Sequence, residues 1–279
     1  MPAPAAPPSQ TRPALTDRHA LARHRARASG GAWFLHEAAA DEVQERLADV
    51  NRTFTAPAIV TAHPDLWRGV VPGAAMVAEG DVLDLAPGAH DLIVHAMALH
   101  WADDPVGQLI QCRRALREDG LLLAVLPGGE TLWELRAALG QAEAEVTGGM
   151  SPRVLPMGDT RDLGGLLQRA GLALPVADVT TLRARYRDLA HLARDLRAMG
   201  ETNALASRHR RTPPRALFER AEAIYRMAHA DGDGIRATFQ LVFLTGWAPS
   251  ETQQKPLRPG SAQARLADAL GVAEMGTER

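Results

Sequence analysis

The stretch that decides the fold runs from Asp91 to Glu130, DLIVHAMALHWADDPVGQLIQCRRALREDGLLLAVLPGGE. It opens with the apolar run Leu92–Val94, which is short enough to be a buried strand. In the turn Ala102–Pro105 an aspartate can cap a helix, and Pro105 suits the first helical position. Apolar residues then recur at helical spacing, and Gly120 is the predicted C-terminal stop of that helix.

A second strand is predicted at Leu121–Leu126, where every residue is apolar. Such a strand implies cover on both faces, as in parallel sheets. Strand, helix and strand within this length predict one right-handed βαβ crossover. Polar and glycine residues follow the two strands at His95–Trp101 and Pro127–Glu130, and ligands of open α/β sheets bind at such strand ends. The stretch therefore predicts an α/β protein and outlines its site.

Composition excludes several classes of protein. The 279 residues are 46% apolar and 23% charged, which is ordinary for a globular protein, and the net charge of -2 gives no footprint for nucleic acid. Cys112 is the single cysteine, so an intramolecular disulfide is impossible. Histidines and carboxylates show no metal-site spacing, and no apolar run reaches the ~20 residues of a membrane helix. We expect no metal and no membrane segment.

The N-terminal arm, residues 1–30, is expected to be partly disordered, because Met1–Pro13 is rich in proline and alanine. Arginines at several positions up to Arg27 would also suit an organelle transit peptide. The lack of a clear apolar face argues against transit, so a cytoplasmic location is favoured over the mitochondrial matrix. At the other end, residues 251–279 are predicted to be a tail.

Other elements follow from periodicity and turn signals. Strands are predicted at 57–62, 74–78 and around Val176 and Val179, with a possible one at 81–85, and the most strand-like segment is Thr238–Trp247. Helices are predicted at 35–47, 187–199 and 214–230. Another begins at Thr131, where Thr131 and Glu134 have the spacing of a capping box.

Several segments resemble one protein family. The segment LHWADDPVGQLIQCRRALREDGLLL resembles class I S-adenosylmethionine methyltransferases, in particular the malonyl-carrier-protein methyltransferase of biotin synthesis. Residues 126–178, DLRAMGETNA and ATFQLVFLTGWAPSETQQKPLRPGSA resemble the mitochondrial complex I assembly factor 5 group and its alphaproteobacterial relatives. The resemblance implies a methyltransferase-like domain at 31–250. Its Rossmann-like sheet would have the order 3-2-1-4-5-7-6 with strand seven antiparallel, and a helical insertion at about 187–230 would cap the site.

The chain departs from that family where the cofactor should bind. Class I methyltransferases hold S-adenosylmethionine on a glycine-rich loop after strand one, whose N–H groups approach the ligand closely. The equivalent stretch, Ile59–Trp67, has no glycine, and Pro64 removes an N–H donor. Fewer than thirty residues separate Ala62 from Asp91, where the full fold needs about fifty. At least one helix, with or without a strand, is predicted to be missing or vestigial.

The resemblance also assigns candidate site residues. Cofactor contacts would come from the ends of the first, second and fourth strands of that fold, at Ala62, His63, Glu79, His95 and Ala96. Catalytic candidates are His100, Trp101 and Glu130, and substrate-binding candidates are Gly128, Gly129, Glu201 and Asn203.

Each candidate has a structural alternative. The histidines can be packing residues, Trp101 can seal the core, and glycines at a strand end usually form turns. Glu201 and Asn203 can cap a helix end. His63 and Asp65 can be turn residues rather than an acid–base pair.

Three functions remain open. The assembly factor 5 group resembles methyltransferases but is associated with hydroxylating an arginine of a complex I subunit. That resemblance implies a protein partner, a quinone-module subunit of complex I, with Glu130 and Glu201 as carboxylates that accept an arginine fork. The second candidate is an orthodox S-adenosylmethionine-dependent methyltransferase acting on a small molecule or a carrier protein. The third is a non-catalytic assembly chaperone that has lost cofactor binding.

Overall fold

The computed structural model describes residues 14–28 and 33–253. The chain divides into a unit that ends at Pro249 and a second unit, Ser250–Arg279, of which residues 250–253 are described. The expected disorder of Met1–Pro13 and most of the expected tail lie outside the described residues. The sheet belongs to the first unit.

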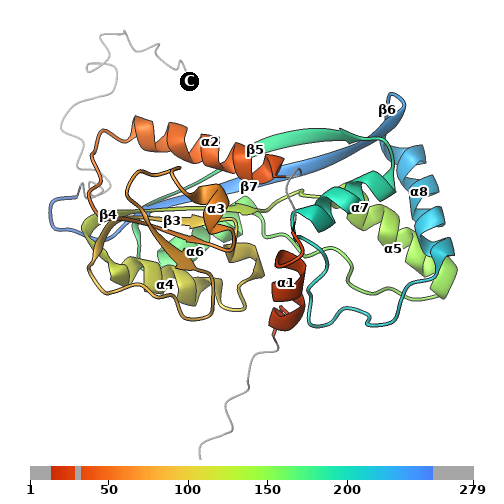
Figure 1. Ribbon diagram of the computed structural model, residues 1–279, viewed down its shortest axis with the longest axis horizontal. Coiled ribbons are helices and arrows are strands. Elements are labelled where there is room, and N and C mark those ends of the chain that lie inside the picture. The colour runs from red at the N-terminus through yellow and green to blue at the C-terminus, as the bar shows by residue number, and fades with distance from the viewer. Residues whose placement is uncertain (1–13, 29–32, 254–279) are drawn as a thin grey trace, which may run out of the picture. The chain divides into compact units, whose positions relative to one another are not determined.

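The sheet has the order β2-β1-β3-β4-β7-β5, with the short strand β6 (Ala230–Asp231) paired to β7 (Figure 1). β1 (Pro57–Thr61), β2 (Ala75–Ala78), β3 (His90–Ala96) and β4 (Leu116–Pro127) are parallel. β7 (Gly234–Trp247) runs antiparallel to both β4 and β5 (Ala173–Tyr186). The predicted α/β class and the antiparallel strand between its two neighbours are both confirmed.

The predicted βαβ crossover is confirmed, with one correction. α4 (Pro105–Ala115) joins β3 to β4, and the Asp104 carboxylate caps it by accepting from the N–H of Gly107 over 2.9 Å. The prediction that Gly120 ends the helix is wrong, because Leu116 already pairs with His90 as part of β4. A register shift between His90 and Leu92 takes up the extra residues before regular pairing resumes.

Side chains alternate between two cores along the central strands. Ile59, Val94 and Leu123 pack in one core with α2 (Phe34–Asp49) and α5 (Trp133–Thr147). Their strand neighbours, such as Ile93 and Leu122, pack in the other with α4 and α6 (Thr160–Arg169). This period of two, with both faces covered, explains why the central strands are apolar throughout.

The half of the sheet before β3 is shortened, as predicted. Between β1 and β3 the chain forms only the one-turn helix α3 (Pro64–Trp67) and β2. The possible strand at 81–85 is wrong. Val82 is 84% exposed, and the N–H of Leu83 bonds to the Gln111 side chain over 2.8 Å rather than to a strand. Relative to the seven-strand order of the resemblance, the strand beyond β2 is absent from the described residues.

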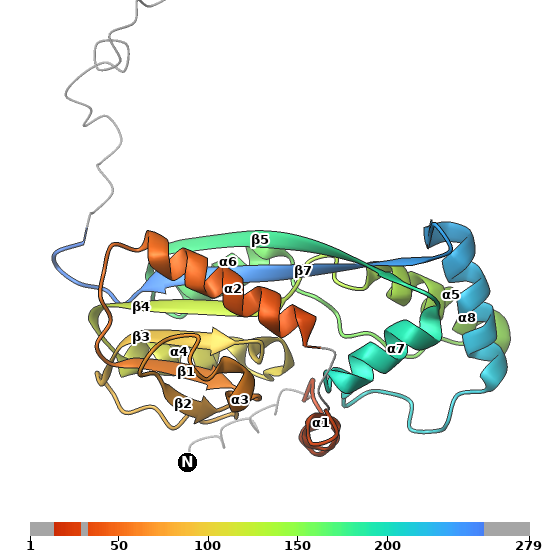
Figure 2. The same ribbon diagram turned by 45° about the horizontal axis from the view of Figure 1, so that its top comes forward.

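β5 and β7 extend beyond the parallel strands and support the helical insertion (Figure 2). β4 pairs only with residues 241–247 of β7, whereas β5 pairs with residues from Ile235 to Trp247. α7 (Leu189–Ala198) and α8 (Arg215–His229) follow β5, and α5 packs against α8. The two predicted helices of the insertion are therefore present, and the extension positions them beside the ends of β3 and β4.

The predicted capping box at the start of α5 is wrong. The helix begins at Trp133 after Leu132, which has a left-handed backbone and no side-chain cap. The Thr131 hydroxyl instead donates to the carbonyl of Gly128 and accepts from the N–H of Gln240. Glu134 is fully buried and accepts from the N–H of Thr238 over 3.2 Å. The two side chains that the local pattern assigned to the cap form hydrogen bonds to β7 instead.

Candidate functional site

A cavity of about 360 Å³ lies at the carboxyl ends of β3 and β4, beneath the helical insertion. Most of its lining is apolar, from α2, α5, α7, α8 and the loop at 153–157. Its polar and charged members come from six segments: His36, His100, Trp101, Thr131, Arg153, Arg197, Glu201, Thr202 and Asn203. Ligand pockets in this type of sheet combine an apolar wall with a few placed polar groups, and this cavity has that character.

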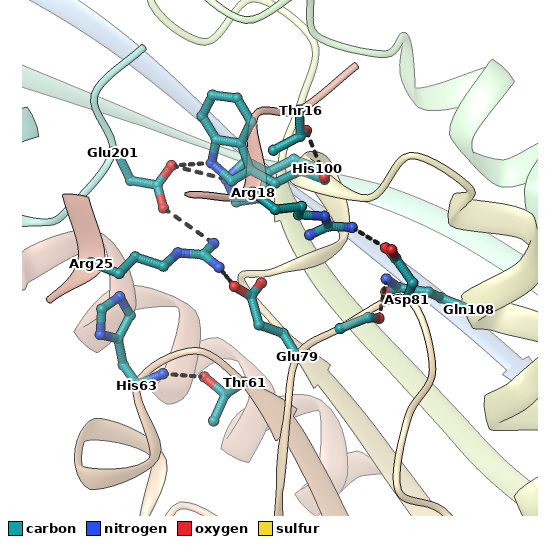
Figure 3. Close-up of polar contacts among 12 residues, drawn as sticks. Thr16, Arg18, Arg25, Thr61, His63, Glu79, Asp81, His100, Gln108 and Glu201 are labelled. Atoms are coloured by element: carbon teal, nitrogen blue, oxygen red, sulfur yellow. Dashed lines mark hydrogen bonds and ion pairs between the residues drawn. The ribbon is translucent and has the colours of Figure 1, made fainter. Parts of the chain in front are cut away.

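Glu201 is the centre of the polar wall (Figure 3). Its Oε2 accepts from the indole N–H of Trp101 over 2.7 Å and lies 3.1 Å from Nε2 of His100. Its Oε1 forms an ion pair with the guanidinium of Arg25 at 3.7 Å. Three of the residues predicted from the sequence therefore meet at one point, although Glu201 is far from the other two along the chain.

Local structure explains this convergence. His100 and Trp101 form a single 3₁₀ turn, Leu99–Trp101, directly after β3, so both side chains lie at the strand end. Glu201 follows Gly200, whose φ of +79° ends α7 with a turn that glycine adopts without strain. A Cβ atom on Gly200 would approach the backbone of Arg25 within 3.1 Å. Gly200 thus directs Glu201 to the site and admits the neighbouring helix α1 (Arg18–Arg25).

The charge of Glu201 is stabilised by its partners. Burial alone raises the pKa of this carboxyl, but the charge and hydrogen bond of His100, the charge of Arg25 and the bond from Trp101 outweigh it. The net effect holds the pKa of Glu201 well below its usual range, so the group is a carboxylate at neutral pH. Nδ1 of His100 is buried without a hydrogen-bond partner.

A second cavity, of about 500 Å³, lies at the ends of β1 and β2, where the methyltransferase cofactor was expected. Ala62, Glu79 and Pro64 line it, together with Ala22 and Arg25 of α1. Glu79 directly follows β2, the position predicted for the ribose-binding acid, but its carboxylate forms an ion pair with Arg25.

These residues do not fit S-adenosylmethionine in the family's manner. The loop after β1 has no glycine, and the N–H of His63 bonds to Oγ1 of Thr61 over 3.2 Å instead of facing a ligand. Pro64 has no N–H, and the one acid at the end of β2 is already paired. We therefore derive no chemical step through this cofactor.

Aromatic rings occupy the place of the glycine loop. His63 lies 4.9 Å from the ring of Trp33 and 5.1 Å from that of His36, and Nδ1 of His36 accepts from the indole of Trp67. Burial lowers the pKa of His36 to about 3, and burial followed by the charge of Arg25 lowers the pKa of His63. Both rings are neutral at pH 7. The ring of His63 is packed against these aromatic side chains, but its Nε2 is buried without a hydrogen-bond partner, and its predicted cofactor role remains a proposal.

His95 and Ala96 are both fully buried in β3. Nε2 of His95 bonds to Oε1 of Gln108 over 2.9 Å, and the amide of Gln108 donates to the carbonyl of Gly80. Burial lowers the pKa of His95 to about 4, so the ring is a neutral link between β3, α4 and the chain after β2. Neither His95 nor Ala96 lines either of the two cavities.

The residues predicted after β4 lie apart from Glu201. The N–H groups of Gly128 and Gly129 bond to the carbonyls of Gln240 and Gly158 over 3.0 and 2.8 Å. A Cβ atom on either glycine would collide with β7 side chains, so close packing requires them. Glu130 is exposed and lines a separate polar hollow with Arg183 and Arg236. The structure does not place it beside His100 and Trp101.

Asn203 lines the first cavity but uses its amide internally. Its Nδ2 donates to the carbonyl of Pro152 over 2.8 Å, and its Oδ1 accepts from the N–H of Leu205 over 3.1 Å. Arg25 was missed at the sequence level, where it belonged only to an arginine-rich arm. No local pattern could have paired it with residues 79 and 201. Within residues 14–28 and 33–253, no helix could span a membrane and no cluster of three His, Cys, Asp or Glu could hold a metal.

No family model matches the chain. It is 33% identical over 215 residues to the mitochondrial arginine-hydroxylase NDUFAF5 of Danio rerio, covering 75% of this chain and 65% of that protein. It is 36% identical over 187 residues to the malonyl-[acyl-carrier protein] O-methyltransferase of Laribacter hongkongensis, covering 67% of this chain and 61% of that enzyme. The chain thus spans somewhat less than two thirds of either relative.

Among solved structures, the YcgJ protein of Bacillus subtilis superposes with a TM-score of 0.50 and 12% identity. The match covers 77% of this chain and all of that one. The superposition agrees with the sheet order and the antiparallel β7 described above.

Proposed function

Because the chain has the class I S-adenosylmethionine methyltransferase fold and is related to the NDUFAF5 arginine-hydroxylases, we propose that it is an assembly factor acting on an arginine of a partner protein. The partner in this proposal is a respiratory complex I subunit of the quinone module. The arginine side chain would enter the cavity at the ends of β3 and β4.

Glu201 is the observation that carries the proposal. It is the only acid in the cavity lining among residues 14–28 and 33–253, and it is ionised. A carboxylate held by two donors at the edge of an apolar cavity suits a guanidinium, whose planar fork bonds to carboxylates and whose weak hydration tolerates burial. The apolar walls, including Leu135 and Phe239, would accommodate the methylene chain of the same side chain.

A second candidate function has its own support. The loop after β1 has no glycine, and the acid predicted to bind the ribose of the cofactor, Glu79, is paired with Arg25. Both observations favour a non-catalytic chaperone that binds the partner protein without modifying it. Titration calorimetry with S-adenosylmethionine and its demethylated product separates this candidate from a methyltransferase. Tight binding excludes loss of the cofactor site, and absence of heat at millimolar ligand excludes methyl transfer.

The test of the main proposal is recovery of the partner. The full-length protein, expressed in a strain that lacks the native copy, should co-purify with the quinone-module subunit, and mass spectrometry should map a changed arginine on that subunit. Glu201→Ala should abolish the change. Glu130→Ala is the matched variant, because it alters an exposed acid in the other hollow. It should leave the change intact, and loss of the change would restore Glu130 as the second predicted guanidinium contact.

Each result has a distinct meaning. Co-purification without a changed arginine would support the chaperone. An arginine that is modified equally by the wild type and Glu201→Ala would remove Glu201 from the site. Absence of any complex with the subunit would overturn the proposed partner.

A further inference from the structure

We propose that Glu79 and Glu201 together form a guanidinium-binding site that Arg25 of the chain itself occupies, and that an incoming arginine side chain binds there by displacing Arg25. The inference rests on the proposed function for the origin of the incoming arginine. The site itself is defined by residues of this chain alone.

Arg25 joins two carboxylates from distant parts of the chain (Figure 3). One terminal nitrogen contacts Oε1 of Glu79, at the end of β2, and the other lies 3.7 Å from Oε1 of Glu201, after α7. The side chains of Arg25, Glu79 and Glu201 are 7%, 19% and 16% exposed. One guanidinium therefore neutralises two largely buried acids, which would repel each other if it left.

The Arg25–Glu201 pair also separates the two cavities. Glu201 lines the larger cavity at β3 and β4, whereas Arg25 and Glu79 line the smaller one at β1 and β2. In a sheet of this kind both cavities belong to one crevice at the strand ends. Removing the Arg25 side chain would leave a space bordered by two carboxylates and open to the apolar cavity.

The site has hydrogen-bonding capacity that Arg25 leaves unused. Nε and both terminal nitrogens of Arg25 are buried without a hydrogen-bond partner, so its guanidinium is held in place by ion pairing. The His100 side chain is 4% exposed, lines the larger cavity, and has an unpartnered Nδ1. A guanidinium that enters from the larger cavity can meet Oε1 of Glu201 in a different orientation and approach His100. With Nε2 of His100 bonded to Glu201, Nδ1 is a buried atom that an incoming guanidinium can reach and Arg25 leaves unpartnered, and this difference favours exchange of one arginine for another.

The attachment of α1 allows Arg25 to move alone. The helix is fixed at its N-terminal end, where the Thr16 hydroxyl donates to the carbonyl of Trp101 and the N–H of Asp17 donates to that of Ala204. Leu21 is buried beside Trp101 and Leu205. Arg25 is the last residue of the helix, so its long side chain can change rotamer without undocking these contacts.

Competition from Arg25 sets the expected affinity. If Arg25 leaves the site in about one molecule in ten, an external guanidinium binds about tenfold more weakly than to a site from which Arg25 has been removed. A fixed structural clamp behaves differently, because the wild type would then bind no external guanidinium at all.

The first experiment uses Arg25→Ala in the full-length protein, with N-ethylguanidinium as the probe. The variant should melt at a lower temperature, and millimolar N-ethylguanidinium should restore part of the loss while ethylammonium should not. Arg18→Ala is the matched control, because Arg18 lies on the same helix and pairs with the exposed Asp81. Absence of rescue in Arg25→Ala, or equal rescue in Arg18→Ala, would overturn the proposal.

The second experiment measures competition directly and keeps a side chain at the position. Acetyl-arginine-methylamide should bind Arg25→Lys about tenfold more tightly than the wild type, by calorimetry, since lysine cannot reproduce the planar fork. Acetyl-lysine-methylamide should bind neither protein, and Glu201→Gln should remove the binding. Equal affinity of the wild type and Arg25→Lys would mean that the compound binds outside this site, and absence of binding to the wild type would mean that Arg25 is a fixed clamp. Either result would overturn the proposal.

These tests are independent of the partner protein. Rescue and competition with no complex I subunit recovered would leave the guanidinium site standing and overturn the proposed function. A modified subunit without rescue or competition would support the proposed function and overturn the guanidinium site.

Discussion

Trp101 donates its indole N–H to Oε2 of Glu201 over 2.7 Å and thereby joins the turn after β3 to the segment after α7. This contact ties the helical insertion to the parallel sheet at the edge of the cavity. The same oxygen lies 3.1 Å from Nε2 of His100, so one carboxylate oxygen meets both side chains of the 3₁₀ turn. The geometry of the cavity wall therefore depends on a small number of polar contacts.

Trp101→Phe should remove one of these contacts while keeping most of the ring. The lost bond is to a charged acceptor, so we expect the free energy of unfolding to fall by about 1.5–3 kcal/mol. Urea unfolding measures the change. Trp133→Phe is the control, because Trp133 is 40% exposed on α5, and it should change stability by less than about 0.5 kcal/mol. Equal effects of the two substitutions would contradict a structural role for the Trp101–Glu201 bond.

Glu201→Ala should be more damaging, because it leaves the buried Arg25 with Glu79 alone and removes the acceptor of Trp101. Breaking one side of a buried ion pair costs about 3–5 kcal/mol. Glu219→Ala is the control, since it breaks an exposed pair with Arg215 worth about 0–1 kcal/mol. Thermal and urea unfolding of the two variants provide the comparison. A loss below about 1 kcal/mol for Glu201→Ala would show that solvent screens this cluster.

Gly129→Ala and Gly140→Ala should change stability in opposite directions. Gly129 has a φ of +52°, and a Cβ atom there would collide with Oε1 of Gln240, so we expect a loss of about 1–3 kcal/mol. Gly140 lies inside α5 with no atom within 4 Å of an added Cβ, so alanine should stabilise the helix by about 0.5–1 kcal/mol. Differential scanning calorimetry of both variants checks the signs, and a neutral Gly129→Ala would show that the turn before α5 can relax.

Stability should fall as the pH drops from neutrality toward 4. Burial lowers the pKa of His36 to about 3 and that of His95 to about 4, from 6.5 in an unfolded chain. Below pH 6.5 the unfolded state therefore binds protons that the folded state does not, and each histidine contributes a slope of about 1.4 kcal/mol per pH unit. Urea unfolding at several pH values measures that slope.

A pair of substitutions controls the histidine effect. His36→Phe should lower the slope of the free energy of unfolding against pH by about 1.4 kcal/mol per pH unit. His19→Gln, which alters an exposed residue, should leave the slope unchanged. Asp91 and Glu201 titrate in a different window. Their pKa values are lowered because hydrogen bonds, and for Glu201 nearby charges, outweigh burial, so their contribution is lost from about pH 5 downward, as the pH passes the unfolded-state values of 3.8 and 4.5. An unchanged slope in His36→Phe would mean that this ring takes up its proton in the folded state.

The βαβ crossover at Asp91–Glu130, the α/β class and the shortened half before it could be predicted from the sequence. These features depend on local period, on the Asp104 cap and on chain length, all of which are visible in one dimension. The sequence also identified His100, Trp101 and Glu201 as candidates. Where local signals competed with distant partners they failed, as at Thr131 and Glu134, whose side chains bond to β7.

The surroundings of those candidates depend on contacts between segments that are distant in the sequence. The tertiary structure separated Glu130 from the cavity, buried His95 against Gln108, and placed Arg25 between Glu79 and Glu201. An arginine in a sequence carries a charge but no indication of its partner, because ion pairs form between segments that packing brings together. Local pattern therefore identified part of the site. The pairing of Arg25 with the carboxylates of Glu79 and Glu201 depends on how α1 docks on the sheet.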